Sequence, residues 1–220
     1  MSDKFNELQE KMPFPNVDLN LKAMPESFIG KGKDIIVREI YRHGYTDLLE
    51  VGSFLGGSIF FWLNACYPLN IVAVDPFTGG WAGTHCVNLR YNKKSLLTML
   101  PEDINVLNSI NGLYHTFLRN FEWAGEYKKR VVILRQTIEE AIPILQKAEY
   151  KPDIIFLDAN KNYNTLELLF QSFKNSQLSG DDYQWKDSNE QYAMQYNLRL
   201  LCETYGLKLQ HHEDTWLIHQ

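Results

Sequence analysis

The sequence has no long hydrophobic run, few cysteines and no excess of positive charge, and each shortage excludes a class of protein. Its most apolar stretch, Ile59 to Leu63, is far shorter than the roughly 20 residues that a membrane-spanning helix needs. The first ten residues contain no apolar signal-peptide core, so we expect a cytoplasmic protein without a membrane partner. Cys66, Cys86 and Cys202 form no C-x-x-C pair, which indicates reduced, buried thiols.

The 220 residues carry a net charge of -5, and their lysines and arginines are scattered. Without a basic stripe, a small molecule is a better expected partner than nucleic acid. We expect one folded domain at 31–220, preceded at 1–30 by an irregular, proline-containing arm or lid. The sequence leaves open whether copies of the chain form a homo-oligomer.

Short apolar runs alternate with stretches of helical periodicity, and this alternation predicts an α/β fold. The runs predict buried strands at Asp47–Val51, Ile71–Val74, Val131–Leu134 and Asp153–Leu157. The helical stretches are Asp34–His43, Gly57–Asn64, Ile104–Trp123, Thr137–Lys147 and Asn164–Asn175. Because parallel strands are joined by crossovers, we expect helices on both faces of a mostly parallel sheet.

The C-terminal part departs from this alternation. A helix is predicted at Asn189–Tyr205, followed by strands at Leu207–His211 and Thr215–His219 that are joined by H-E-D, a reversal short enough to make them antiparallel. The segment N-S-Q-L-S is a weak candidate for a further strand. The predicted fold is therefore Rossmann-like and doubly wound, with a mostly parallel seven-stranded sheet and a C-terminal antiparallel hairpin.

A glycine-rich loop follows the first predicted strand, from Glu50 to Ser58. A P-loop would have a lysine after its last glycine, where this chain has Ser58. The dinucleotide fingerprint G-x-G-x-x-G is also broken, because Ser53-Phe54 stand where its second glycine would be. The remaining pattern, E-x-G-x-x-x-G, resembles the first motif of class I methyltransferases. Ser58 could cap the next helix. A tight strand-to-helix turn that binds no ligand is the structural alternative.

The second and third predicted strands also deliver polar residues to the carboxyl edge of the sheet, where ligands of open α/β sheets bind. Asp75 ends I-V-A-V-D, where a carboxylate can accept both hydroxyls of a ribose, or can instead open the D-P-F-T-G-G turn. After the third strand, Gln136 or the adjacent backbone could meet an adenine edge. Thr137 and Glu140 have the spacing of a capping box.

Three carboxylates are expected at the far side of the same edge. Asp158 ends the fourth strand, and Asp181 and Asp182 follow the next helix. Crowded carboxylates repel one another unless one is protonated or a cation joins them, which favours a divalent ion with oxygen ligands. The alternative is a solvated Asp181-Asp182 turn with Asp158 bound to backbone amides.

These segments together resemble the small metal-dependent O-methyltransferases. The matching segments are E-V-G-S-F-L-G-G-S, I-V-A-V-D, D-I-I-F-L-D-A-N-K-N-Y and L-S-G-D-D-Y-Q-W. Two branches are similar, namely the macrolide-sugar methyltransferase and cephalosporin hydroxylase family and the caffeoyl-CoA and catechol type. The resemblance implies S-adenosylmethionine as cofactor, bound by Glu50, Gly52, Ser53, Gly56, Ser58, Asp75 and Gln136. It also implies Mg2+ or Mn2+ held by Asp158, Asp181 and Asp182.

The resemblance implies methyl transfer to a hydroxyl of a sugar, polyol or catechol-like molecule. A metal at Asp158 would lower the pKa of that hydroxyl, and Lys161 is the candidate to stabilise the activated oxygen or accept its proton. The sugar-type branch has a histidine in D-G-D-H-x-Y, whereas this chain reads D-A-N-K-N-Y; His85 is a second candidate base. Aromatic residues that would wall the acceptor pocket or pack a lid are Phe77, Trp81, Tyr183 and Trp185. Two rival functions remain, a hydroxylase-like enzyme of the same fold and a non-catalytic partner protein.

Overall fold

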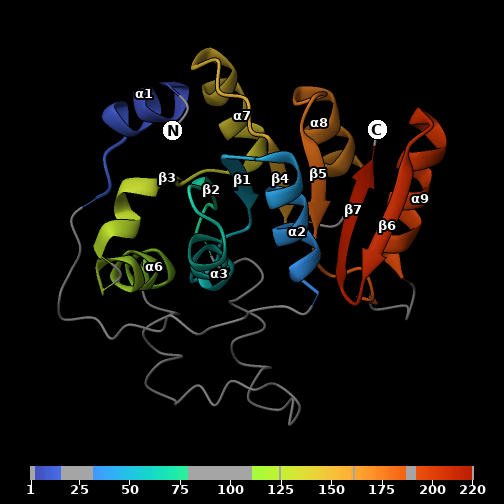
Figure 1. The fold of residues 1–220 in the computed structure, drawn as a ribbon, viewed down its shortest axis with the longest axis horizontal. Helices are drawn as coiled ribbons and strands as arrows, with labels where there is room; N and C mark the ends of the chain where they lie inside the picture. Colours follow the sequence, from blue (N-terminus) through green and yellow to red (C-terminus); the bar gives the residue numbers. More distant parts are fainter. Residues whose placement is uncertain are drawn as a thin grey trace, which may run out of the picture.

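The computed structural model describes residues 3–15, 32–78, 111–123, 125–160, 162–186 and 192–219. In these residues one seven-stranded sheet has the order β3-β2-β1-β4-β5-β7-β6 (Figure 1). Strands β1 to β5 are parallel, whereas β7 is antiparallel to both β5 and β6. The predicted mostly parallel sheet with a C-terminal hairpin is therefore confirmed. The strands are β1 (Asp47–Val51), β2 (Asn70–Val74), β3 (Val131–Leu134), β4 (Ile154–Leu157), β5 (Gln177–Gly180), β6 (Lys208–His212) and β7 (Thr215–His219).

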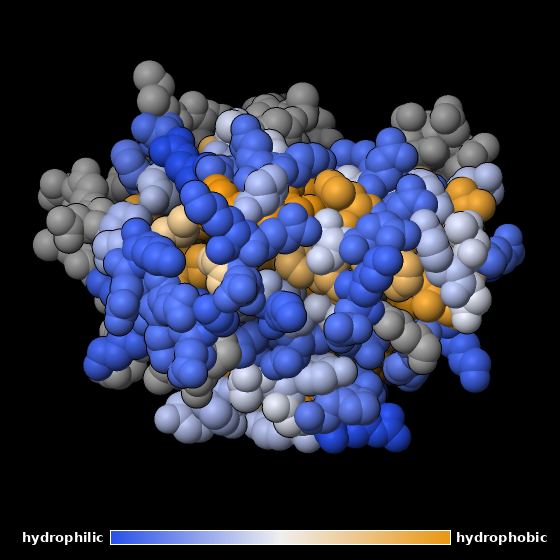
Figure 2. Space-filling model, turned by 90° about the horizontal axis from the view of Figure 1, so that it is seen from above, coloured by the Kyte–Doolittle hydropathy of each residue, from blue (hydrophilic) through white to orange (hydrophobic). Residues whose placement is uncertain are grey.

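Helices cover both faces of this sheet and bury two hydrophobic cores. One core joins the sheet to α2, α3 and α6, and the other joins it to α1, α7, α8 and α9. Figure 2 looks onto the amino ends of the parallel strands and shows hydrophobic residues lying between hydrophilic ones. The helices are α1 (Asp3–Lys11), α2 (Asp34–His43), α3 (Gly57–Ala65), α6 (Gly112–Trp123), α7 (Ile138–Lys147), α8 (Tyr163–Ser172) and α9 (Ala193–Tyr205), with a 3-10 helix at Gly125–Arg130.

Strand β1 shows why the strands are rich in apolar residues and do not alternate between apolar and polar positions. All five of its residues are buried, because side chains on both faces of a central parallel strand meet helices. Leu49 and Val51 face the core of α1 and α7 to α9, while Leu48 faces the core of α2, α3 and α6. By the same alternation Glu50 lies on the Leu48 side, where it is completely buried.

The start of the chain corrects one prediction. Residues Asp3–Lys11 form α1 rather than an irregular arm. Phe5 and Leu8 are one helical turn apart, and both are buried in the core beside β3. The i, i+3 spacing of these two residues was the signal for a helix. The remainder of the predicted arm, from residue 16 onward, lies outside the described residues.

The packing around strand β5 explains why its sequence has few apolar residues. Ser179 is completely buried, and its hydroxyl donates a hydrogen bond to the Ile155 carbonyl at 2.6 Å. At Gly180 a Cβ would lie 2.3 Å from the Leu157 carbonyl oxygen and 2.4 Å from the Trp216 ring. Small residues are therefore required here because the indole of Trp216 occupies the space that an apolar side chain would fill.

Candidate functional site

The strand register places the predicted site residues in one row at the carboxyl edge of the sheet. Val51 pairs with Val74 of β2 and with Leu157 of β4, Val74 pairs with Leu134, and Leu157 pairs with Gly180. The residues that follow these five positions form the row: Gly52, Asp75, Arg135, Asp158 and Asp181. Parallel pairing thus brings together residues that are up to 129 positions apart in the sequence (52 to 181).

The glycine-rich loop needs its glycines for close approaches of the chain to itself. Gly52 has φ +91°, and a Cβ there would lie 2.2 Å from the Asp158 carbonyl oxygen. Gly56 has φ +84°, and its Cβ would lie 2.7 Å from the Phe121 ring. Helix α3 begins directly after Gly56, with no side-chain cap. The suggested capping role of Ser58 is therefore wrong, since Ser58 lies buried inside the first turn of α3.

Glu50 is a completely buried carboxyl group beside this loop. Trp62 Nε1 donates a hydrogen bond to Glu50 Oε1 at 3.3 Å, while Oε2 has no hydrogen-bond partner among the described residues. Burial raises the pKa of Glu50 to about 7, although the Ser58 hydroxyl and the Lys33 ammonium lower it. Glu50 is therefore a group that can change its protonation state near neutral pH and has one oxygen available to a ligand.

Asp75 binds backbone amides on two sides. Its Oδ2 accepts a hydrogen bond from Phe54 N at 2.9 Å, and its Oδ1 accepts one from Phe77 N at 2.6 Å. Both phenylalanines have positive φ, 45° and 52°, a conformation that side chains other than glycine rarely adopt. Asp75 thus fixes the glycine-rich loop and opens the turn after β2, as in the turn alternative. A carboxylate oxygen can accept two hydrogen bonds, so a ribose-binding role for Asp75 is compatible with these contacts.

The segment after β3 combines a helix cap with a buried amide oxygen that has no hydrogen-bond partner among the described residues. Thr137 and Glu140 form the predicted capping box of α7, with Glu140 N donating to Thr137 and Thr137 N donating to Glu140. Gln136 Oε1 is buried and has no hydrogen-bond partner among the described residues. Ser53 Oγ, on the glycine-rich loop, is in the same state. Buried oxygens without partners are costly, and a bound ligand can supply the missing donors.

The three predicted metal ligands are not arranged as a metal site. No group of three His, Cys, Asp or Glu side chains able to hold a metal ion occurs among the described residues, which include Asp158, Asp181 and Asp182. Instead, Lys33 Nζ lies 2.9 Å from Asp181 Oδ2, and both side chains are buried, at 2% and 8% exposure. The cation that relieves the crowding at Asp181 is thus an ammonium group of the protein. Asp182 has φ 63° and lies in the turn that follows β5.

The remaining predicted residues are placed only in part. Lys161, Trp81 and His85 lie outside the described residues. Phe77 is 4% exposed and packs between Tyr114 and Phe117, with ring centroids 5.2 and 5.0 Å away. Its placement agrees with the packing alternative. Among the other aromatic candidates, Tyr183 is buried and stacks on His211, while Trp185 is 38% exposed.

Sequence reasoning missed Lys33, which directly precedes α2 and whose Nζ contacts Asp181 in the row of site residues. Nothing in its immediate sequence, F-I-G-K-G-K-D, distinguishes it from the neighbouring Lys31. The Gly32 that precedes it has φ +83°. A glycine two residues before a helix start was the available signal for a close chain approach.

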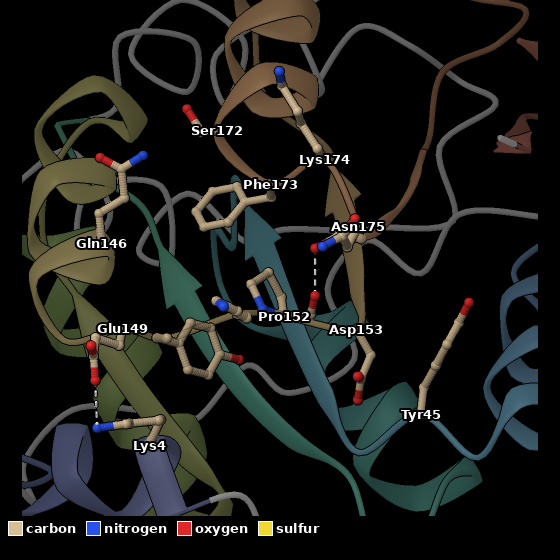
Figure 3. A pocket seen from close by; sticks show the side chains of 13 residues that line it. Lys4, Tyr45, Gln146, Glu149, Pro152, Asp153, Ser172, Phe173, Lys174 and Asn175 are labelled. Atoms are coloured by element: carbon tan, nitrogen blue, oxygen red, sulfur yellow. Dashed lines mark hydrogen bonds and ion pairs between the residues drawn. The ribbon is translucent and has the colours of Figure 1, made fainter.

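A separate hollow of about 600 Å3 lies at the opposite edge of the sheet (Figure 3). It is bordered by residues that precede the parallel strands, including Tyr45, Asp153 and Asn175, and by Lys4 of α1. Lys4 is already paired with Glu149 across the rim, at 3.0 Å. Because ligands of open α/β sheets bind at the carboxyl ends of the strands, this hollow is not the candidate site.

Comparison with known proteins reveals similarity of fold. No family model matches the chain, and no curated protein matches it. Cofactor-bound Rv0187 from MTB is 13% identical, with 98% of this chain and 87% of that chain covered and a TM-score of 0.56. The SAH-bound methyltransferase PaMTH1 from Podospora anserina is 14% identical, with 100% and 88% covered and a TM-score of 0.53.

A third similar structure is the O-methyltransferase TomG from Streptomyces achromogenes, which is involved in tomaymycin synthesis and was solved with SAM. It is 14% identical, with 99% of this chain and 89% of that chain covered and a TM-score of 0.53. In its described residues the chain therefore has the Rossmann-like fold of methyltransferase structures. None of the described helices is long and apolar enough to span a membrane.

Proposed function

We propose that this protein is a methyltransferase that moves the methyl group of S-adenosylmethionine to a hydroxyl group of a small molecule. The observation that carries the proposal is the arrangement at the carboxyl edge of the sheet, where the glycine-rich loop, Asp75 and Gln136 follow three neighbouring strands. The fold shared with SAH-bound and SAM-bound methyltransferase structures supports it. The expected setting is the cytoplasm, with no nucleic-acid or membrane partner.

The residues present fit an adenosyl cofactor. Glu50 Oε2, Ser53 Oγ and Gln136 Oε1 are buried oxygens without a hydrogen-bond partner among the described residues, and all three belong to the predicted cofactor set. Gly52 and Gly56 allow the loop backbone to approach a ligand closely. In this proposal Asp75 binds the ribose hydroxyls, Gln136 meets the adenine edge, and Glu50 and the loop from Gly52 to Ser58 hold the remainder of the cofactor.

When bound, the cofactor supplies an electrophilic methyl group on a sulfonium sulfur. The protein must hold the acceptor oxygen in line with this methyl group, since alignment lowers the barrier of a displacement reaction. The oxygen forms a bond to the methyl carbon, the carbon–sulfur bond breaks, and the proton of the hydroxyl passes to a base. Lys161 is our candidate for that base, with His85 as the second candidate, and we propose that Asp158 acts beside the reacting groups.

Calorimetry with S-adenosylhomocysteine tests the cofactor site. We expect the wild type to bind one equivalent and Asp75→Ala to bind at least tenfold more weakly. The control is Asp153→Ala, because Asp153 Oδ2 accepts hydrogen bonds from Thr46 N and Asp47 N at the opposite edge of the sheet. That variant loses the same kind of amide contact and should keep its affinity within twofold. Equal affinity of the wild type and Asp75→Ala would remove Asp75 from the cofactor site.

Transfer of a labelled methyl group to sugar, polyol and catechol acceptors tests the reaction itself. Binding of S-adenosylhomocysteine together with transfer to a hydroxyl supports the proposal. Binding without transfer to any acceptor would favour the non-catalytic partner protein, and a product without the labelled methyl would favour a hydroxylase-like enzyme.

A further inference from the structure

The side chain of Lys33 is a buried cation within the carboxyl-edge site. Lys33 directly precedes α2, which packs on the same face of the sheet as α3 (Figure 1). Its residue exposure is 2%. Its Nζ lies 2.9 Å from Asp181 Oδ2 and 4.3 Å from the centroid of the Phe156 ring. The ammonium is therefore surrounded by a carboxylate and the face of an aromatic ring, both of which attract a cation.

The backbone around Lys33 is shaped to insert this side chain. At Gly32 a Cβ would lie only 2.1 Å from the His212 carbonyl oxygen, at the end of β6. The glycine thus allows the chain to pass directly against the β6–β7 hairpin before α2 begins. The Lys33 carbonyl then accepts hydrogen bonds from Ile36 N and Val37 N in the first turn of α2, at 3.1 and 3.3 Å. The backbone position from which the Lys33 side chain extends is therefore fixed by Gly32 before it and by the first turn of α2 after it.

The buried pair leaves one oxygen of Asp181 without a partner among the described residues. Asp181 is 6% exposed, and its Oδ1 makes no hydrogen bond with any described residue. A buried lysine and a buried aspartate are stable only when paired, so the ammonium is committed to Oδ2. A divalent cation at Asp181 would lie beside this ammonium and be repelled by it. The unpartnered Oδ1 is accordingly available to a neutral ligand group such as a hydroxyl.

We propose that Lys33 is the cation of this site and holds Asp181 in position, so that no divalent ion is bound there. Lys33 is then a positioning residue that acts through Asp181. The consequence for the acceptor rests on the proposed methyl transfer. If that proposal holds, the acceptor needs only one hydroxyl group, placed at Asp181, whereas chelation of a metal would need a vicinal pair of hydroxyls. The acceptor class thereby widens from diols and catechols to molecules with a single hydroxyl.

Titration of the metal-free wild type with Mn2+, followed by electron paramagnetic resonance, tests the first step without any assay of activity. We expect no Mn2+ site with a Kd below about 1 mM, a value at the weak end of the range for carboxylate-ligated Ca2+ sites. A site of one equivalent that is present in the wild type and lost in Asp181→Asn would overturn the proposal. Titration of the same samples with S-adenosylhomocysteine tests the proposed function separately. The Mn2+ result does not depend on whether the protein binds this cofactor product.

Thermal unfolding of charge variants tests the pairing of Lys33 with Asp181. Lys33→Met leaves a buried carboxylate without its cation, and we expect its Tm to fall by about 10 °C. The double variant Lys33→Met/Asp181→Asn removes both charges and should recover at least half of this loss. Additive losses from the two single changes would contradict the pairing. If Lys33→Met does not fold, the double variant and the wild-type Mn2+ titration still decide the question.

Discussion

Replacing Glu50 with glutamine should remove a pH dependence from the stability of the protein. Burial raises the pKa of Glu50 from 4.5 to about 7. At about 1.4 kcal/mol per pH unit, this difference corresponds to about 3 kcal/mol. Because the folded state holds the proton more tightly than the unfolded state, this contribution to stability is complete below about pH 4.5 and is lost as the pH rises through about 7. Glu50→Gln retains an oxygen that can accept the hydrogen bond from Trp62.

The assay is urea denaturation of the cofactor-free protein at several pH values between 5 and 8. We expect the free energy of unfolding of the wild type, relative to Glu50→Gln, to decrease by roughly 2–3 kcal/mol over this range. The control is Glu139→Gln, because Glu139 is exposed on α7 and its replacement should leave the pH profile parallel to the wild type. A constant difference between the wild type and Glu50→Gln from pH 5 to 8 would refute the perturbed pKa of Glu50.

Two further predictions concern local structure. Thr137→Ala removes the side-chain acceptor of the α7 capping box and should lower the free energy of unfolding by about 1 kcal/mol in urea denaturation, with an unchanged value counting against the cap. Gly52→Ala places a Cβ 2.2 Å from the Asp158 carbonyl oxygen and should destabilise the protein and weaken S-adenosylhomocysteine binding. The matched control is Gly44→Ala, where φ is also positive, at +66°, but no atom beyond the adjacent residues lies within 4 Å of the added Cβ. This change should cost about 1 kcal/mol and leave binding unchanged. Equal effects of the two changes would contradict the close approach at Gly52.

The sheet and the edge of the site could be predicted from the sequence because both depend on local patterns. Apolar runs such as Asp47–Val51 end in polar or glycine residues, and parallel pairing then aligns the ends of the strands. Gly52, Asp75 and Asp158 could therefore be assigned to one edge before the structure was known. The capping box at Thr137 was also predictable, because its two residues lie only three positions apart.

The contacts that complete the site could not be predicted, because they join residues without a local signal. Lys33 meets Asp181 across 148 positions of sequence, and a lysine near a helix start is normally solvated. The amide contacts of Asp75 depend on positive φ angles at Phe54 and Phe77, which their residue type does not suggest. The prediction of a metal ion at Asp158, Asp181 and Asp182 did not consider a buried lysine as the source of the positive charge.

A crystal structure of the wild type with S-adenosylhomocysteine tests the central claim most directly, that the carboxyl-edge row binds an adenosyl cofactor. The account predicts the ribose hydroxyls against Asp75, the adenine edge against Gln136 and the chain of the cofactor along the loop from Gly52 to Ser58. A nucleoside bound elsewhere, or a carboxyl edge filled by the protein's own side chains, would contradict it.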